Sequence, residues 1–417
     1  MERKAWSVVG AAYGDEGKGL ATDALASWLL HQGRKPVVVR ANSGAQAGHT
    51  VTTPDGKRHV FHHIGSGSFL GVPTHLSRFM ALHPTAFIRE LEVLAEKAPA
   101  VAITASPDAP VTTPWDMLIN QIVETHRAGG RHGSCGLGFG ETLERTEKGP
   151  VLLARDLGRA HLPDVLRRIR EEWVPLRLAR LGVGVVPEPF ASVLANPGVE
   201  AAFLRDVGAF LANVELVDDR TALTRADAVI FEGAQGLALD QDFGAFPHVT
   251  RSNTGLRNPV ALCAEAGIGR VEVLYMTRSY ATRHGAGPFP REAVALEGVR
   301  VVDATNVPNP WQGTLRVSPV DAGALRAAIT WDLADVSGSG VKVEARLGVT
   351  HLDCIDDDAV VAAGGATLRP GAALFGGALA EVVGLPLGLA AFGPSRDRVT
   401  LDASWAVLAD HEAVCAA

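Results

Sequence analysis

Short apolar runs and amphipathic stretches alternate along most of this chain. An apolar run at residues 6–11 precedes a stretch of helical character at residues 20–30, and a second apolar run follows at residues 35–40. A strand-helix-strand order of this kind predicts a right-handed crossover between two parallel strands. The pattern therefore predicts an α/β protein with a mostly parallel central sheet flanked by helices.

The remaining segments extend this pattern toward the C-terminus. Further strands are predicted at residues 101–104, 228–231, 271–275, 341–345, 349–352 and 388–392. Helices are predicted at residues 85–97, 112–126, 162–182, 199–213, 322–335, 372–383 and 401–412. We expect one domain over residues 1–417, with helical insertions around residues 85–220.

Several predicted strands end in loops that are rich in glycine and polar residues. Such loops meet at one edge of a parallel sheet, so we expect them to form one composite site. The first of them, residues 14–19 (GDEGKG), joins a strand to a helix. This arrangement directs backbone N–H groups and a helix N-terminus toward one spot, where a phosphate can bind. An acid, Asp15, lies near Lys18 in the same loop, which indicates chemistry as well as binding.

Three further loops carry candidate functional groups. Residues 41–51 contain His49, which taken alone could equally make an ordinary loop hydrogen bond. Residues 232–255 follow a buried strand as a long irregular segment, which a compact domain tolerates mainly for function. Residues 131–141 contain four glycines that allow close backbone approach to a ligand, although a flexible surface loop has the same composition.

Charge and composition narrow the class of partner. The chain has 417 residues, 39 basic and 46 acidic side chains, and a formal net charge of −7. This balance excludes a general basic surface for nucleic acid and favours a small-molecule partner. The four cysteines are far apart and indicate neither a zinc site nor a disulfide framework. Since no apolar stretch of about 20 residues occurs, we expect a cytoplasmic protein without a membrane span.

The loops together resemble those of the adenylosuccinate synthetase family. The matching motifs, in the family's order, are GDEGKG at 14–19, AGHTV at 47–51, EGAQG at 232–236, Asp240, Gly244, Pro247, VT at 249–250, SNT at 252–254, TR at 282–283, GAGPFP at 285–290, THLD at 350–353 and GPSR at 393–396. The resemblance implies a P-loop-like nucleotide-binding fold with large insertions. It also implies ligation of L-aspartate to IMP, driven by GTP with Mg²⁺, through a 6-phosphoryl-IMP intermediate.

The resemblance assigns chemical roles to the first two loops. Asp15 matches the base that removes the purine N1 proton, and it also matches a magnesium ligand together with the Gly48 carbonyl. His49 matches the general acid that stabilises charge on the departing β-phosphate oxygen. Lys18 would hold phosphates and offset their charge. The other positions of these loops that are expected to bind GTP are Gly14, Glu16, Gly17, Gly19 and Thr50.

Two further groups of residues match the nucleotide-reading positions of the family. Asp353 matches the carboxylate that reads the N1–H and N2–H₂ donors of guanine, which adenine lacks. Gly393 and Pro394 would close over the same base, and His351 would also contact GTP. The residues expected to bind IMP are Gln46, Ser134, Cys135, Gln235 and Thr250.

Three departures from the family pattern fall at the substrate contacts. Ser134 and Cys135 stand where the family has two threonines, and His351 stands where a lysine usually precedes the guanine-reading motif. The aspartate-binding loop lacks its Thr-Thr-Gly and its arginine cluster between residues 306 and 315. Arg316 is then the candidate for gripping the aspartate carboxylate, because a guanidinium fork fits a carboxylate.

The resemblance further implies a homodimer in which the partner lends an arginine to the nucleotide phosphate. Arg131 and Arg145 are the two candidates for this arginine. Two other functions compete with the one described. A divergent branch acts on dGMP as a 2-aminoadenylosuccinate synthetase, but that branch tends to lose acids that are kept here as Asp15 and Asp353. A GTP-binding switch or GTPase would need a hydroxyl after Lys18, where this chain has Gly19.

Overall fold

Ten strands form one sheet in the order β16-β15-β12-β9-β1-β8-β2-β5-β6-β7. In the computed structural model, the described residues are 3–127, 130, 132–301, 314–356, 361–363 and 366–402. The strands are β1 (Lys4–Gly10), β2 (Pro36–Arg40), β5 (Thr74–Leu76), β6 (Ile103–Ala105), β7 (Glu215–Leu216), β8 (Ala228–Glu232), β9 (Arg270–Arg278), β12 (Lys342–Thr350), β15 (Leu387–Ala391) and β16 (Val399–Leu401). Each neighbouring pair is parallel except β15 and β16, so the mostly parallel α/β fold is confirmed.

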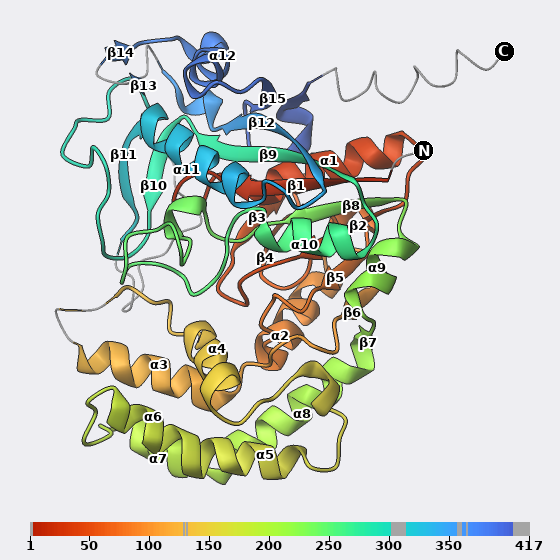
Figure 1. The fold of residues 1–417 in the computed structure, drawn as a ribbon, viewed down its shortest axis with the longest axis vertical. Coiled ribbons are helices and arrows are strands. Elements are labelled where there is room, and N and C mark those ends of the chain that lie inside the picture. Colours follow the sequence, from red (N-terminus) through yellow and green to blue (C-terminus); the bar gives the residue numbers. More distant parts are fainter. Residues whose placement is uncertain are drawn as a thin grey trace.

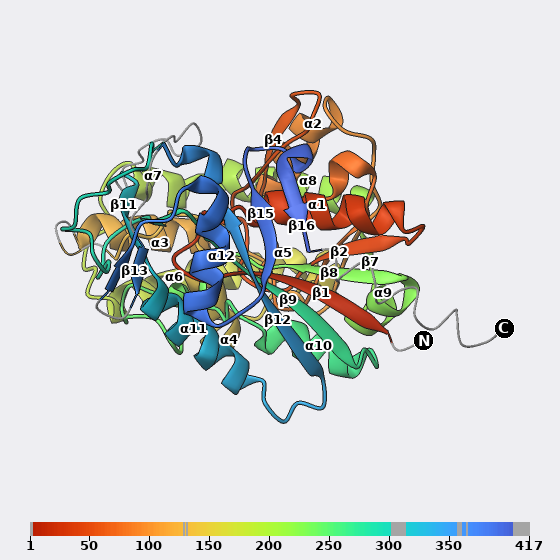
Figure 2. The same ribbon diagram turned by 90° about the horizontal axis from the view of Figure 1, so that it is seen from above.

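Helices cover both faces of this sheet (Figure 2). Helix α1 (Lys18–His31) packs on one face, against strand residues such as Trp6 and Val8. The opposite face packs against α9 (Asp219–Arg225), α10 (Arg257–Glu265), α11 (Ala322–Asp335) and α12 (Ala372–Val383). Because successive side chains of a strand point to opposite faces, β1 contributes alternate residues to the two cores.

A second group of helices lies beyond the β5–β6–β7 end of the sheet. These are α2 (Pro84–Ala95), α3 (Pro114–His126), α4 (Phe139–Lys148), α5 (Leu162–Arg168), α6 (Val174–Arg180), α7 (Phe190–Ala195) and α8 (Pro197–Asn213), with a π-helical turn at Ile169–Trp173. Figure 1 shows α3–α8 gathered below the sheet. Their apolar sides form a core of their own, which includes the buried indoles of Trp115 and Trp173. The division of the chain into domains stays a prediction.

Two smaller sheets flank the main one. Strands β3 (His49–Thr52) and β4 (Arg58–Phe61) form an antiparallel hairpin, and β3 begins within the second predicted loop, 41–51. Strands β10 (Tyr280–Arg283), β11 (Arg316–Asp321), β13 (Val361–Ala363) and β14 (Ala366–Leu368) form a four-stranded sheet beside β9. Since β10 follows β9 almost directly, this sheet continues from the central strand toward the carboxyl edge.

Two predicted elements need correction. Residues 341–345 and 349–352 were expected as separate strands, but β12 is continuous and pairs with β9 from Lys342 to Thr350. The polar Arg346 interrupts the apolar pattern, yet it stays in the strand because its Nη1 donates to Glu272 on β9 over 2.6 Å. The helix expected at residues 401–412 is wrong at its start, because Leu401 ends β16. Its remainder from residue 403 lies outside the described residues.

No helix within the part of the chain that the structure describes combines the length and the apolar character needed to cross a bilayer.

Candidate active site

The carboxyl ends of the central strands open into a cleft of about 1040 Å³. The loops after β1, β8, β9 and β12 contribute to its wall, as does the β3–β4 hairpin. Eighteen of the nineteen predicted site residues line this cleft: Gly14, Asp15, Glu16, Gly17, Lys18, Gly19, Gln46, Gly48, His49, Thr50, Ser134, Cys135, Gln235, Thr250, His351, Asp353, Gly393 and Pro394. The exception is Arg316.

Glu16 holds the glycine loop in shape from within. Its Oε1 accepts hydrogen bonds from the backbone N–H groups of Ala12 and Gly14, at 3.1 and 2.7 Å. Its Oε2 lies 2.6 Å from the Lys18 ammonium, and both side chains are buried. The carboxylate therefore supports the loop and its lysine, and the contact of Glu16 with GTP stays a prediction.

The turn at Gly17 brings the loop onto β12. Gly17 has a left-handed φ of 82°, and a Cβ at this position would lie 2.7 Å from Cγ2 of Thr350. The hydroxyl of Thr350 donates to the carbonyl of Glu16 over 3.2 Å. Only a residue without a side chain allows this approach at low cost.

Asp15 lies at the tip of the loop in an unusual backbone conformation, with φ at 59°. Its Oδ2 lies 2.8 Å from Nε2 of His284, and its carbonyl accepts a hydrogen bond from Arg278. Burial alone would raise the pKa of Asp15, but His284, Arg278 and Lys18 together hold it well below the usual range. The carboxylate is therefore ionised at neutral pH.

His49 is held from behind by a second acid. Its Nδ1 lies 2.7 Å from Oε1 of Glu232 at the end of β8, and Ser66 donates to the same carboxylate through its hydroxyl and, over 3.0 Å, its backbone N–H. Burial lowers the pKa of His49 to about 4, with Glu232 opposing the shift and Arg40 reinforcing it. The ring is neutral at pH 7, and its Nδ1–H donates to Glu232.

Arg40 completes this buried group at the end of β2. Its Nη1 lies 4.0 Å from Oε2 of Glu232, and none of its guanidinium nitrogens has a hydrogen-bond partner among the described residues. Burial alone would raise the pKa of Glu232, but His49 and Arg40 lower it to about 2. Arg40 thus affects His49 in two opposed ways: its own charge lowers the pKa of His49, and it maintains the charge on Glu232 that raises this pKa.

The positions predicted to bind IMP lie on two sides of the cleft. Gln235 has a left-handed φ of 65°, and the buried Oε1 of Gln46 has no hydrogen-bond partner within the described chain. The hydroxyl of Ser134 is already engaged, donating to Asn120 Oδ1 over 2.8 Å. Burial raises the pKa of the Cys135 thiol, which therefore stays protonated. Gln46 is accordingly the member of this set with an unmet hydrogen bond.

At the other end of the cleft, His351 and Asp353 follow β12. His351 has a left-handed φ of 58°, and its Nδ1 lies 2.9 Å from the Thr350 hydroxyl. Burial and the neighbouring Arg278 lower the pKa of His351 to about 3, so the ring is neutral. The side chain of Asp353 is exposed to solvent. The loop after β12 therefore presents a neutral histidine and, two positions later, an accessible carboxylate.

The sequence matches the family model described as adenylosuccinate synthetase over residues 7–307. The chain belongs to this family. A curated adenylosuccinate synthetase from Anaeromyxobacter sp. (strain Fw109-5) is 33% identical over 298 residues, which are 70% of this chain and 66% of the relative. The match therefore spans just under two thirds of that relative's length. The enzyme from Marinomonas sp. (strain MWYL1) is 32% identical over 85% of this chain and 78% of the relative.

Two solved structures share the fold of this adenylosuccinate synthetase family member. The fully ligated adenylosuccinate synthetase from Plasmodium falciparum superimposes with a TM-score of 0.68 at 17% identity, covering 96% of this chain and all 100% of that chain. The succinoaminodeoxyadenylate synthetase of cyanophage S-2L, bound to dGMP and dATP, superimposes with a TM-score of 0.59 at 18% identity, covering 96% of each chain.

Arg316, predicted to grip the aspartate carboxylate, is engaged elsewhere. Its Nε and Nη2 both donate to the carboxylate of Glu292, the former over 2.6 Å. Its Nη1 donates to the carbonyls of Gly285 and Gly287, each at 3.0 Å. In this structure the guanidinium fork holds a carboxylate of the chain itself, and the contact of Arg316 with aspartate stays a prediction. Residues 306–313 of the predicted aspartate loop lie outside the described residues.

The two arginines proposed to reach a partner subunit fare differently. Arg145 is fully buried and donates to both carboxylate oxygens of Asp116, at 2.8 and 2.9 Å, and to two backbone carbonyls. A side chain with this set of partners cannot extend across an interface, so that candidate is wrong. Arg131 lies outside the described residues.

Four side chains at the site had no predicted role: Arg40, Glu232, Arg278 and His284. A signal was present for Arg40, Glu232 and Arg278, because they lie at, or a few residues beyond, the end of a predicted strand. His284 had no such signal, because strand β10 before it was not predicted. Polar groups at the carboxyl edge of a parallel sheet are the usual source of site residues. Their contacts with Asp15 and His49 could not be predicted from the sequence.

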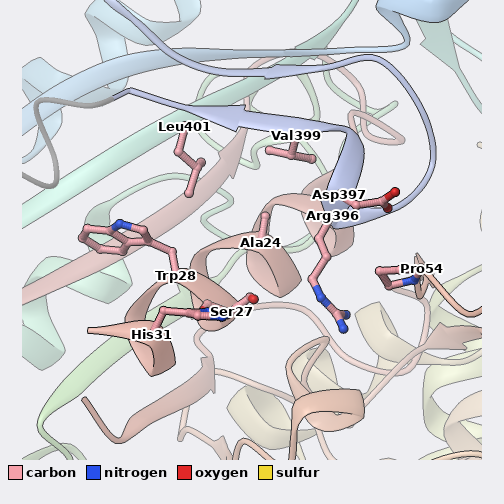
Figure 3. A pocket seen from close by; sticks show the side chains of 9 residues that line it. All are labelled: Ala24, Ser27, Trp28, His31, Pro54, Arg396, Asp397, Val399 and Leu401. Atoms are coloured by element: carbon pink, nitrogen blue, oxygen red, sulfur yellow. The ribbon is translucent and has the colours of Figure 1, made fainter. Parts of the chain in front are cut away.

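A smaller hollow of about 330 Å³ lies away from the cleft, between α1 and β16 (Figure 3). Arg396 lines it and reaches toward α1, where its Nη1 lies 3.0 Å from Oδ2 of the buried Asp23. Burial raises the pKa of Asp23 to about 6, against the opposing effect of Arg396. This ion pair ties α1 to the loop that carries Gly393 and Pro394 into the main cleft.

Proposed function

We propose that this protein ligates L-aspartate to IMP, using GTP and Mg²⁺, through a 6-phosphoryl-IMP intermediate to give adenylosuccinate. The observation that carries the proposal is the convergence of Asp15, Lys18 and His49 on one cleft in a chain of this family. In the same proposal the protein acts as a homodimer in the cytoplasm, as the family resemblance implies.

In this mechanism Asp15 removes the proton from N1 of the purine. The 6-oxygen then carries the negative charge and attacks the γ-phosphate of GTP. Support comes from the ionised state of the Asp15 carboxylate, because only the ionised form can accept the proton. Lys18 and the N–H groups of the glycine loop hold the phosphates and offset the charge that develops on them.

His49 acts on the departing β-phosphate oxygen. Since Nδ1 is taken by Glu232, Nε2 is the ring nitrogen left to contact a phosphate. Burial alone favours the neutral ring, but a phosphate placed beside an imidazole raises its pKa by favouring the charged form. A protonated His49 would then donate to the leaving oxygen while Glu232 stabilises the imidazolium.

The donor set of the cleft fits Mg²⁺. Among the described residues no group of three or more His, Cys, Asp or Glu side chains could enclose a metal ion. Mg²⁺ does not need such a cage, because it usually binds one or two protein oxygens together with substrate phosphates and water. We assign Asp15 and the Gly48 carbonyl to this role. The ion would neutralise charge on the phosphates of GTP.

The substrate assignments follow the two ends of the cleft. Gln46, Ser134, Cys135, Gln235 and Thr250 would bind IMP. Asp353 would accept from the guanine donors of GTP, next to His351, Gly393 and Pro394. Support for a purine N–H partner comes from Gln46, whose buried Oε1 lacks a hydrogen bond among the described residues, since such an oxygen costs free energy until a donor reaches it.

A substrate panel tests the proposal. Purified protein with Mg²⁺ and L-aspartate is mixed with IMP, dIMP, GMP or dGMP, each with GTP or ATP, and products are separated by chromatography and weighed by mass spectrometry. We expect adenylosuccinate and GDP from IMP with GTP. If dGMP were the only acceptor that is turned over, the result would assign the 2-aminoadenylosuccinate reaction instead. GTP cleavage that needs no acceptor would assign a GTPase, and no turnover with any pair would refute both ligase reactions.

The Asp15→Asn variant is the control for the mechanism. It keeps the size of the side chain and a hydrogen-bonding oxygen but cannot take a proton. We expect it to lose acceptor-dependent cleavage of GTP, and unchanged turnover would contradict the assignment of Asp15 as the base.

A further inference from the structure

The turn after β10 carries His284 to the catalytic loop. Strand β10 ends at Arg283, and the next residue places its Nε2 at 2.8 Å from Oδ2 of Asp15. Both side chains line the main cleft. The Asp15 carboxylate is an acceptor, so the ring nitrogen that faces it carries the proton and donates. This contact joins residues that are 269 positions apart in the sequence.

The turn is braced from its own side by Arg283. This side chain is almost fully buried and donates to the carbonyls of Ala286, Pro288 and His248, at 2.8, 2.8 and 3.3 Å. Three backbone carbonyls around one guanidinium fix the path of the chain on both sides of His284. The backbone of the turn is therefore held independently of any ligand.

Arg316 braces the same turn from β11. Its Nη1 donates to the carbonyls of Gly285 and Gly287, both at 3.0 Å, while Glu292 holds the other side of the fork. The guanidinium also lies over the ring of Phe289. The partners of Arg316 thus connect it through the turn to His284, and through His284 to Asp15.

We propose that His284 is a positioning residue for Asp15, and that Arg316 supports it by fixing the turn that carries it. This inference rests on the proposed function, in which Asp15 is the base. A carboxylate at the tip of a glycine loop can rotate about its side-chain bonds, and reaction geometry tolerates little misplacement. A hydrogen bond from His284 to Oδ2 fixes the plane of the carboxylate and so directs Oδ1.

Two substitutions of His284 separate the hydrogen bond from the packing. His284→Ala removes the donor, whereas His284→Gln places an amide nitrogen the same number of bonds from Cβ. For His284→Ala we expect kcat of the acceptor-dependent reaction to fall about 10- to 100-fold, with the KM for GTP changed less than about twofold, since the phosphate contacts remain. His284→Gln should recover most of kcat.

Arg316→Ala tests the outer part of the brace, with Arg291→Ala as its matched control. Arg291 forms an exposed ion pair with Asp321 at 2.9 Å in the same region but does not donate to the turn. Arg316→Ala should lower kcat, as His284→Ala does. Its effect on the KM for aspartate should be no larger than its effect on the KM for GTP. Arg291→Ala should leave both constants unchanged.

Three results would overturn the inference. Unchanged kcat in His284→Ala would show that the contact does not matter. Equal losses in His284→Ala and His284→Gln would show that the donor is not the reason. If His284→Ala lost GTP binding and also had a lowered melting temperature, His284 would be a structural residue only.

A spectroscopic readout separates this inference from the proposed function. In ¹⁵N-histidine spectra of the protein without nucleotide, the signal of His284, assigned from His284→Gln, should show a protonated Nε2 and should move in Asp15→Ala. If the wild type turns over no substrate pair, the proposed function fails while this readout still reports the contact. If the signal shows no Nε2 proton, or does not move in Asp15→Ala, the inference fails on its own.

Discussion

Nδ1 of His49 lies 2.7 Å from Oε1 of Glu232, and both side chains are buried at the carboxyl edge of the sheet. The carboxylate orients the ring, so that only Nε2 is available in the cleft. A histidine held in this way donates or accepts at that one nitrogen. Arg40 lies on the other side of Glu232 and keeps it ionised.

The Glu232→Gln substitution tests this arrangement. It keeps the shape of the side chain but removes the charge that would stabilise a protonated His49, so we expect kcat to fall about 10- to 100-fold. It also leaves Arg40 buried without a counter-charge, which should cost roughly 3–5 kcal/mol of the free energy of unfolding. Steady-state kinetics and urea unfolding measure the two effects. Ser66→Ala, which keeps the charge, is the control, and equal losses in both variants would contradict the explanation.

The buried pair of Glu16 and Lys18 makes a second prediction. Lys18→Met and Glu16→Gln each leave one buried charge without its partner, so each should destabilise the protein by roughly 3–5 kcal/mol. In the double variant neither charge remains, and the loss should be smaller than the sum by roughly 1–3 kcal/mol. Urea unfolding of the wild type, the two single variants and the double variant measures this difference, which is the coupling free energy of the pair.

Nucleotide binding separates the two roles of Lys18. The double variant should recover part of the stability but should not bind GDP, because Lys18, the phosphate anchor, is still missing. Titration calorimetry measures the binding. Additive losses of stability would show that the pair does not act as a unit. Recovery of GDP binding in the double variant would mean that Lys18 is not the anchor.

Much of the site followed from the order of strands and loops. A parallel sheet brings the carboxyl ends of its strands to one edge, so His49, which follows β2, could be placed from sequence beside Asp15 and Lys18, which follow β1. The predicted bounds of two helices, 322–335 and 372–383, are confirmed by α11 and α12.

What could not be predicted were the choices between chemically equivalent partners. The fork of Arg316 fits a substrate carboxylate and the carboxylate of Glu292 equally well, and only the fold decides that Glu292 is in reach. Glu16 was likewise expected at GTP, but its carboxylate turns back to its own loop. Such pairings depend on side-chain direction and on contacts between distant segments, which no local pattern encodes.

The contact between Gly17 and Thr350 leads to a third prediction, for which Gly33 offers a matched control. Both glycines have left-handed φ values, of 82° and 70°, but a Cβ at Gly33 would meet nothing within 4 Å. Each alanine substitution should cost about 1–2 kcal/mol for the backbone conformation. Gly17→Ala should cost roughly 1–3 kcal/mol more, because its Cβ would press on Thr350.

Urea unfolding of the two variants measures this difference. Adding Thr350→Ser to Gly17→Ala removes Cγ2, the nearest atom, and should recover part of the additional loss while keeping the hydroxyl. Equal costs at Gly17 and Gly33 would show that the loop can move away from β12.

Asp332 on α11 gives a prediction of pH dependence. Its Oδ1 accepts from the N–H of Leu256 over 2.9 Å and its Oδ2 from the Tyr275 hydroxyl over 2.7 Å. Burial nevertheless raises its pKa from 3.8 to about 6. Between these two values the folded protein binds a proton that the unfolded chain has lost, so this group's contribution to stability falls as pH rises. The shift corresponds to a loss of roughly 3 kcal/mol by neutral pH.

Asp332→Asn should remove this dependence, because the amide keeps an oxygen for Leu256 and carries no charge. Relative to the wild type, we expect the variant to gain roughly 2–3 kcal/mol of unfolding free energy between pH 4 and pH 7, measured by urea unfolding at both values. Asp335→Asn on the same helix is the control, since Asp335 is paired with Arg257 at 2.6 and 2.8 Å and its loss should bring no gain. A constant difference between Asp332→Asn and wild type across this range would mean that Asp332 titrates alike in both states, with the two hydrogen bonds offsetting its burial.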